Sequence, residues 1–295
     1  MNNQQVLRLN VFRYRFVAIA ISVSIFLAAA GMYFSGKRFI YSVDFTGGTQ
    51  VQMQFSKPMS AEAIRSVLSI AGWDRVNTRS FGEKTVLIRI QDVETDSKGL
   101  AERMRQAIEQ ADPELNPIIE QSESVGSGVG ASLRYNFLKA IILSLLSLAI
   151  YIFARFWSVG FAIGAVLALV HDGLLMLAMF LILQREVSIV VVGAILAMLG
   201  YSINDTIVIF SQIRDNMKKM HGQSLFYISS TSIDQTLRRT MLTSISTGLP
   251  VLSMLIFGGE VLRDISIALI IGVVFGTSSS IFIASPIMML CSKKK

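Results

Sequence analysis

Three ionisable side chains inside otherwise apolar stretches are the residues of this sequence best able to do chemistry. Asp205 interrupts an uncharged run between positions 187 and 213, and His171 and Asp172 interrupt another between 157 and 183. A charge in the hydrocarbon of a membrane costs about 3 kcal/mol or more, so each such residue is a functional candidate by default. The chemistry open to a buried carboxyl group is proton binding, because burial favours its neutral form and a nearby cation favours its charged form.

Arg238 and Arg239 are the cations best placed to act on Asp205, because they stand where a later apolar run begins, and Arg239 is the deeper of the two. On a helix, Asp205 would lie beside a row of small residues that comprises Gly193, Ala197, Gly200 and Asn204. Membrane helices pack through such rows, so Asp205 is expected to face neighbouring helices. A buried Asp205–Arg239 pair that only fixes the packing is the alternative to a proton-coupling pair.

A secondary polar relay is predicted from His171, Asp172 and Asn204. Histidine titrates near physiological pH, so His171 could exchange protons with Asp172. A hydrogen bond between helices is the alternative role for this pair. We rank all three residues below Asp205 as proton carriers.

The elements that must position these side chains are membrane helices. The chain has 295 residues, of which 52% are hydrophobic and 16% charged, and its mean hydropathy is +0.56. This is too apolar for an ordinary soluble domain. A helix needs roughly 20 mostly apolar residues to cross about 30 Å of hydrocarbon. Six runs of that kind are predicted to span the membrane, at residues 16–34, 137–153, 157–183, 187–213, 240–257 and 265–290.

The distribution of basic residues predicts the orientation of the spans, because Lys and Arg are retained on the cytoplasmic side. Most of those near the spans lie in the N-terminal segment, between the fourth and fifth spans, and at the C-terminus. Both termini are therefore predicted in the cytoplasm, in a multi-pass protein of the inner membrane. The predicted division is an N-terminal segment 1–15, a first span 16–35, a periplasmic domain 36–134, the other spans within 135–290 with a cytoplasmic loop 214–239, and a C-terminal segment 291–295.

The external domain is predicted to be a small α+β fold between the first and second spans of an all-α six-helix membrane bundle. Residues 50–55 and 85–91 alternate between apolar and polar side chains, which is typical of strands, and residues 118–123 are a third candidate. Helices are predicted for residues 60–72, with Ser60 as the N-cap, and for residues 97–111. The result would be an open sheet with two helices on one face.

Several classes of function are excluded or disfavoured by composition. The external domain contains no His and no Cys and no metal-ligand spacing, so we expect no enzyme, no cofactor and no metal site. The net charge of +7 follows from the membrane topology, so nucleic acid is not an expected partner. The glycines of residues 126–130 predict a flexible connector back to the membrane, either a hinge or a passive linker.

Four separate motifs resemble those of one known family. They are residues 44–49 (DFTGGT), 170–172 (VHD), 200–207 (GYSINDTI) and 235–240 (QTLRRT). In this order, with six spans and one external domain, the chain resembles the SecD/SecF family of bacterial protein-export subunits over nearly its whole length. The family belongs to the resistance-nodulation-division superfamily. The length and the single set of six spans resemble the smaller, SecF-type subunit.

The resemblance implies an accessory subunit of the Sec translocase that, paired with SecD, uses the proton motive force to promote export of polypeptides through SecYEG. Asp205 matches the family's essential fourth-span aspartate and Arg239 its arginine partner. The motif after the first span is matched by Asp44, Gly47 and Gly48. The partners implied are SecD, the SecYEG channel, YajC, the translocating polypeptide and membrane lipid. Ser42, Ser127, Ser211 and Asp234 depart from the family's usual residues.

Two other functions compete with this interpretation. A proton-coupled small-molecule exporter of the same superfamily would carry two large external domains on twelve spans, which this chain lacks. A non-transporting structural subunit would not need Asp205 to bind protons, so an Asp205→Asn variant would then leave export unchanged.

Overall fold

The computed structural model describes residues 11–73, 76–80, 82–90 and 97–292. The chain divides into two compact units, one within residues 1–40 and 140–295 and the other within residues 41–139. We call them the membrane unit and the outer domain. The predicted terminal segments lie partly outside the described residues, as does the predicted strand end at Gln91.

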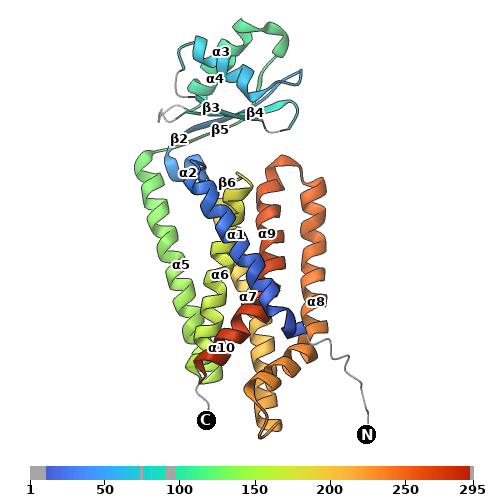
Figure 1. The fold of residues 1–295 in the computed structure, drawn as a ribbon. Helices are drawn as coiled ribbons and strands as arrows, with labels where there is room; N and C mark the ends of the chain where they lie inside the picture. Colours follow the sequence, from blue (N-terminus) through green and yellow to red (C-terminus); the bar gives the residue numbers. More distant parts are fainter. Residues whose placement is uncertain (1–10, 74–75, 81, 91–96, 293–295) are drawn as a thin grey trace. The chain divides into compact units, whose positions relative to one another are not determined.

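Six helices of the described chain are long and apolar enough to cross a membrane, as the sequence predicts (Figure 1). The elements involved are η1 (Val11–Tyr14), α1 (Arg15–Phe34), α5 (Ser127–Phe156), α6 (Val159–Ile182), α7 (Ile189–Lys219), α8 (Leu225–Phe257), α9 (Gly259–Ser279), η3 (Ser280–Ala284) and α10 (Ser285–Cys291). Two short strands, β1 (Ile40–Tyr41) and β6 (Glu186–Val187), lie near helix ends. Within the membrane unit, α6 packs against α1 and α7, and α9 packs against α7 and α8.

Serine side chains cap the starts of α7 and α8. The Ser188 hydroxyl accepts from the Val191 N–H at the start of α7, and the Ser224 hydroxyl accepts from the Tyr227 N–H at the start of α8. The predicted loop at residues 214–239 is therefore mostly helical, and only residues 220–224 join α7 to α8. The apolar runs end earlier than the helices do, because polar side chains continue the helices beyond the hydrocarbon.

The sixth predicted span is not one continuous α-helix. After Ser279 the chain widens into the π-helical turn η3 and resumes as α10, which has Pro286 in its first turn. A proline inside a helix removes one backbone donor and crowds the carbonyl four residues earlier, and a wider turn relieves both problems. Pro286 lies in the first turn of the new helix, where the residue is tolerated.

The outer domain is an antiparallel four-stranded sheet with two helices on one face (Figure 1). Its elements are α2 (Val43–Thr46), β2 (Gly48–Gln54), α3 (Ala61–Ile70), β3 (Val76–Ser80), β4 (Thr85–Ile90), α4 (Ser97–Ala111), η2 (Pro113–Leu115) and β5 (Ile118–Val125). The strand order is β3-β4-β2-β5, with Val51 opposite Ile88 and Gln50 opposite Glu123. The predicted α+β fold is confirmed.

The core of the outer domain lies between the sheet and its helices, as the alternation predicts. Met53 on β2 and Ile88 on β4 are fully buried beside Leu68 on α3 and Met104 on α4. Strand β3 was not predicted, because only one of its five residues, Val76, is apolar. Its place at the edge of the sheet requires one buried side chain rather than a full alternating face.

The prediction of irregular structure at residues 126–130 is wrong. Helix α5 begins at Ser127 and runs through Gly128 and Gly130. A glycine costs about 1 kcal/mol in a helix, but close packing can outweigh that cost. At Gly130 the packing is tight, because a Cβ atom would lie 3.0 Å from the Phe45 carbonyl oxygen and 3.1 Å from the Gly47 nitrogen, and the neighbouring backbone would have to move to admit it.

Candidate functional site

The Asp205 side chain lies on the face of α7 that packs against other helices, and only 2% of the residue is exposed. About two and three helical turns before it, Met198 and Ala194 are also buried. The adjacent row that the sequence predicts as the packing face is instead exposed at all four positions, Gly193, Ala197, Gly200 and Asn204. That prediction is wrong for contacts within this chain, although the burial of Asp205 itself is as expected.

Groups from two neighbouring helices surround the Asp205 carboxylate. The hydroxyls of Thr243 on α8 and Thr277 on α9 face it, and Arg239 on α8 attracts it electrostatically. Its Oδ2 atom is buried and has no hydrogen-bond partner among the described residues. A buried carboxylate oxygen without a donor is costly when charged, so this arrangement is suited to a carboxyl that gains and loses a proton.

The two threonines are held in place by other contacts. Thr277 Oγ1 lies 2.6 Å from Ser244 Oγ across the α8–α9 interface. Thr243 Oγ1 donates to the Thr240 carbonyl at 2.9 Å or to the Arg239 carbonyl at 3.1 Å. Each hydroxyl has one hydrogen, so a bond from it to Asp205 competes with these bonds.

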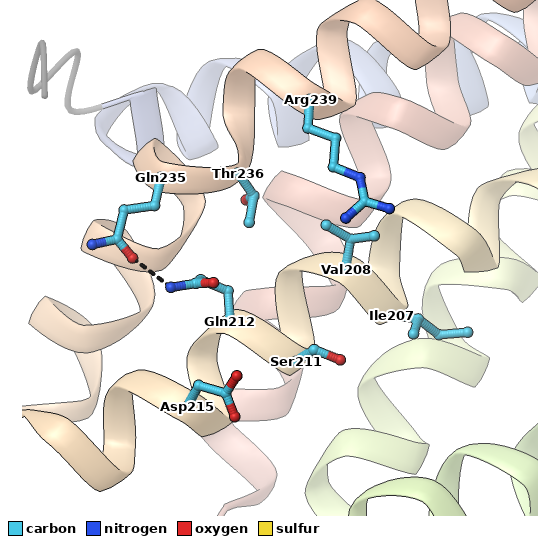
Figure 2. A pocket seen from close by; sticks show the side chains of 8 residues that line it. All are labelled: Ile207, Val208, Ser211, Gln212, Asp215, Gln235, Thr236 and Arg239. Atoms are coloured by element: carbon cyan, nitrogen blue, oxygen red, sulfur yellow. Dashed lines mark hydrogen bonds between the residues drawn. The ribbon is translucent and has the colours of Figure 1, made fainter.

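Arg239 projects from α8 toward α7 into a pocket of about 350 Å³ (Figure 2). The other lining residues are Ile207, Val208, Ser211, Gln212, Asp215, Gln235 and Thr236. Within the described part of the chain, no ion pair closer than 4.0 Å joins Arg239 to Asp205. The predicted pair is therefore an electrostatic attraction across the helix interface in this structure, and not a direct contact. Arg239 lines this pocket, and Arg238 is not among its lining residues.

Amide side chains close the far end of this pocket. Gln235 Oε1 on α8 accepts from Gln212 Nε2 at 2.7 Å and from Asn216 Nδ2 at 2.8 Å, both on α7. Asn216 also donates to the Ser232 hydroxyl at 2.8 Å. Hydrogen bonds thus join the C-terminal part of α7 to the N-terminal part of α8, on the side predicted to be cytoplasmic, while the pocket beside Arg239 stays open.

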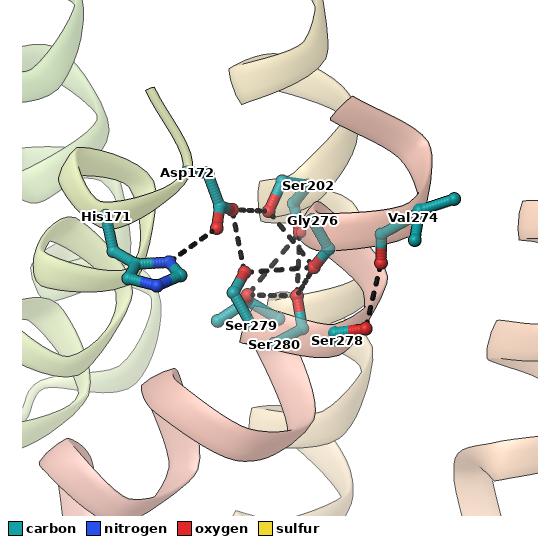
Figure 3. A network of polar contacts seen from close by, with 9 residues as sticks. His171, Asp172, Ser202, Val274, Gly276, Ser278, Ser279 and Ser280 are labelled. Atoms are coloured by element: carbon teal, nitrogen blue, oxygen red, sulfur yellow. Dashed lines mark hydrogen bonds and ion pairs between the residues drawn. The ribbon is translucent and has the colours of Figure 1, made fainter. Parts of the chain in front are cut away.

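His171 and Asp172 form a second polar cluster, on α6 (Figure 3). Asp172 is 2% exposed, and its Oδ1 atom lies 3.1 Å from His171 Nδ1. Its Oδ2 atom accepts from Ser202 on α7 and from Ser279 on α9, each at 2.7 Å. The predicted contact between His171 and Asp172 is present, and the carboxylate also joins three helices.

Asn204 does not join either cluster. It lies on the exposed side of α7, and the described residues provide it no hydrogen bond. The two serines that bond Asp172 were missed by sequence reasoning. A signal existed in residues 277–280, four consecutive hydroxyl side chains in an apolar span, because polar side chains in a span usually hydrogen-bond between helices.

The motif after the first span forms a tight turn in the outer domain. Gly47 and Gly48 have φ angles of 74° and 117°, which favour glycine. Ser42 donates to Asp44 Oδ2 at 2.7 Å and precedes the short helix α2. Together with the close approach of Gly130, these contacts indicate that the motif shapes the join between β2, α2 and α5.

Two family profiles match the chain. The profile described as "Protein export membrane protein SecD/SecF, C-terminal" matches residues 103–294, and the profile "SecD/SecF GG Motif" matches residues 33–59. The first includes Asp205, Arg239, His171 and Asp172, and the second includes the turn at Gly47.

Individual relatives and a solved structure agree with these profiles. The protein translocase subunit SecF of Calditerrivibrio nitroreducens is 38% identical over 254 residues, covering 84% of this chain and 83% of that protein. SecF of Pseudomonas aeruginosa is 35% identical over 283 residues, covering 95% of this chain and 90% of that protein.

The crystal structure of SecDF, a translocon-associated membrane protein from a Thermus species, superposes with a TM-score of 0.84 at 32% identity. The match covers 97% of this chain but only 39% of the SecDF chain. With its six apolar helices and its outer domain, this chain belongs to the SecD/SecF family of protein-export membrane proteins, on the SecF side of that family.

Proposed function

We propose that this chain is an accessory subunit of the Sec protein translocase that pairs with a SecD subunit and uses the proton motive force to promote polypeptide export through SecYEG. The relatives named as SecF subunits support the translocase role, and the SecDF structure supports the SecD partnership. YajC, membrane lipid and the moving polypeptide are the further partners proposed. The chain itself catalyses no covalent reaction in this proposal.

The main observation in favour of proton coupling is the environment of the Asp205 carboxylate. It is buried on α7, one of its oxygens has no partner among the described residues, and hydroxyls from α8 and α9 face it. When Asp205 is charged, it attracts Arg239 and favours a tighter α7–α8 approach. When Asp205 is protonated, that attraction is lost and the open pocket around Arg239 becomes the preferred arrangement.

The helices would pass this change to the outer domain, which handles the polypeptide outside the membrane. The proposed orientation places both termini in the cytoplasm, because basic residues gather at the α7–α8 connection and at the chain ends. Protons would then reach Asp205 from the outer side and leave through the pocket that contains Arg239 and Asp215.

The test is an export assay in cells that depend on this chain, comparing Asp205→Asn and Arg239→Met with the unchanged protein. We expect precursor release in both variants to fall to the level seen when an ionophore collapses the proton gradient. Arg238→Met is the matched control, because Arg238 neighbours Arg239 but does not line the pocket. Gradient-dependent export at the normal rate in Asp205→Asn would favour a purely structural subunit instead.

A further inference from the structure

The pair formed by His171 and Asp172 has the composition of a proton carrier. Asp172 is buried and makes three polar contacts, to His171, Ser202 and Ser279. Hydroxyl donors stabilise a charged carboxylate, but in hydrocarbon a net charge still needs a counter-charge. With one shared proton the pair is neutral, as either an imidazolium with a carboxylate or an imidazole with a carboxylic acid.

His171 also faces a cavity on its other side. Its Nε2 atom is buried and has no partner among the described residues. The cavity has a volume of about 270 Å³ and lies between α1, α6 and the α9–η3 segment. Most of its wall is apolar, and its polar lining consists of His171, Ser22, Ser278 and Ser279. The imidazole thus lies between a partly open cavity and the buried carboxylate, and only its Nδ1 atom contacts Asp172.

The Asp172 cluster is connected to the surroundings of Asp205 through two helices. On α9, Ser279 bonds Asp172 and Thr277 faces Asp205. On α7, Ser202 bonds Asp172 and lies one helical turn before Asp205. Next to Asp205 in the sequence, Thr206 Oγ1 lies 2.9 Å from Ser280 Oγ on η3, so further hydroxyls stand where α7 meets the α9–η3 segment.

The geometry points to a second proton-binding site, formed by His171 and Asp172, that receives protons at the imidazole from the cavity beside α1 and passes them to Asp205 along the α7–α9 interface. The imidazole gains a proton at Nε2 as it releases one from Nδ1 to Asp172 Oδ1. This transfer starts from the Asp172 carboxylate and makes the pair neutral. The carboxylic acid then turns to give its proton to a neighbouring hydroxyl, which releases its own, and the imidazole proton moves back from Nε2 to Nδ1 to restore the starting tautomer. This inference rests on the proposed function, because it assigns the supply route of the same proton site.

Few other charged groups influence this site. On α7, Tyr201 and Asp205 are the ionisable residues near Ser202 in the sequence. The described parts of α1 and α9 contribute hydroxyls and apolar side chains. The Arg185–Asp264 ion pair, at 2.6 Å, joins the segment after α6 to the first part of α9 and includes no residue of the cluster.

The experiment measures proton flux into liposomes that contain the whole chain with its copurified SecD partner, using an enclosed pH-sensitive dye and an imposed pH gradient. We expect Asp172→Asn to lower the flux by about 10²-fold or more, the usual effect of losing a positioned proton-transfer group. His171→Gln should shift the pH dependence of the flux as well as lower it. Ser253→Ala removes an exposed hydroxyl of α8 and serves as the control.

Infrared difference spectra between acidic and neutral pH supply a readout that a structural role would not change. Among the carboxylic acid C=O bands of the unchanged protein, we expect one that is lost only in Asp205→Asn and another that is lost only in Asp172→Asn. Asp172→Glu keeps a carboxyl group and should retain more proton flux than Asp172→Asn. This comparison tests the site even if Asp172→Asn folds poorly. Normal flux and both bands in Asp172→Asn would overturn the second site, whereas normal flux in Asp205→Asn would overturn the proposed function itself.

Discussion

The outer domain and the membrane unit have interiors of different chemistry. The outer domain buries large apolar side chains such as Met53, Ile64 and Leu68, with almost no polar group among them. The interior of the membrane unit contains glycines in close contact and a set of buried polar residues, which includes Asp172, Ser202, Asp205, Thr206, Ser279 and Ser280. In water, apolar burial drives folding, whereas in lipid it gives little preference for one helix over another. Close packing and hydrogen bonds must therefore specify the membrane fold.

Truncating the outer core should have the largest effect on stability. We expect Leu68→Ala to reduce the free energy of unfolding of the outer domain by about 2–5 kcal/mol, because the cavity removes contacts with a fully buried side chain. Trp73 packs against this core, so its fluorescence during urea unfolding reports the domain. A Trp157→Phe background removes the other tryptophan, which lies in the membrane unit.

The comparison also predicts the result for Ile70, a neighbouring apolar residue that is 89% exposed. Ile70→Ala should change the same free energy by less than about 0.5 kcal/mol, as is usual for surface positions. Equal losses in Leu68→Ala and Ile70→Ala would contradict the description of an apolar core between sheet and helices.

In the membrane unit, replacing a closely packed glycine by a larger residue should reduce stability in the way that truncating the core does in the outer domain. At Gly272 on α9, a Cβ atom would lie 2.5 Å from Met198 Cγ and 2.7 Å from Met198 Cβ. Gly272→Ala should therefore force α7 and α9 apart and destabilise the unit by about 1–3 kcal/mol. The fraction of protein that stays monodisperse in detergent after heating measures this effect.

Gly193→Ala on α7 is the matched control, because no atom lies within 4 Å of the added Cβ position. Alanine favours a helix over glycine by about 1 kcal/mol, so this variant should be neutral or slightly stabilised. A loss as large as that of Gly272→Ala would mean that the exposed row of α7 is packed in the purified chain.

Removing a helix cap should have a smaller effect in the outer domain. The Ser60 hydroxyl accepts from the Ala63 N–H at 3.2 Å at the start of α3. Ser60→Ala should cost about 1 kcal/mol, again measured by urea unfolding with Trp73 fluorescence. Ser66→Ala lies inside the same helix, where the hydroxyl only bonds the Glu62 carbonyl, and should be neutral or favourable. A larger loss in Ser66→Ala than in Ser60→Ala would contradict the assigned cap.

The two regions also differ in what their sequences predict. Alternation placed Met53 and Ile88 on the buried face correctly, because water makes the two faces of a strand unequal. In the membrane unit, hydropathy located all six spans but not their packed faces. The row that contains Gly193 is exposed within this chain, because a row of small residues does not say which helix, in this chain or another, packs against it.

The candidate site shows the same limit. The charges at Asp205 and His171 could be found from sequence because they are expensive in lipid, whatever their partners. The partners Thr277 and Ser279 depend on how α9 rotates toward α7 and α6, and that rotation follows from the Gly272 contact and the turn before Pro286. Only the three-dimensional packing supplies this information.

The smallest expected effect concerns the surface of the outer domain, where charge contributes little to the fold. On α4, Arg105 contacts Glu102 at 2.6 Å and Glu109 at 2.8 Å. The hydrogen bond from Arg105 lowers the pKa of the Glu102 carboxyl, with its Coulombic attraction as a further cause and partial burial opposing both. Because the folded-state pKa is lowered, the pair contributes stability above the unfolded-state pKa, and this contribution is lost as the pH falls through the folded-state pKa.

Arg105→Ala should therefore lower the urea midpoint slightly at neutral pH and make no difference at a pH where Glu102 is protonated in both states. The midpoint is read from Trp73 fluorescence, with Lys98→Ala, an exposed position of the same helix, as the control. Because solvent screens an exposed pair, added salt should reduce the neutral-pH difference as well. A loss in Arg105→Ala as large as that in Leu68→Ala, or one independent of pH, would mean that ion pairing rather than apolar burial holds α4 on the sheet.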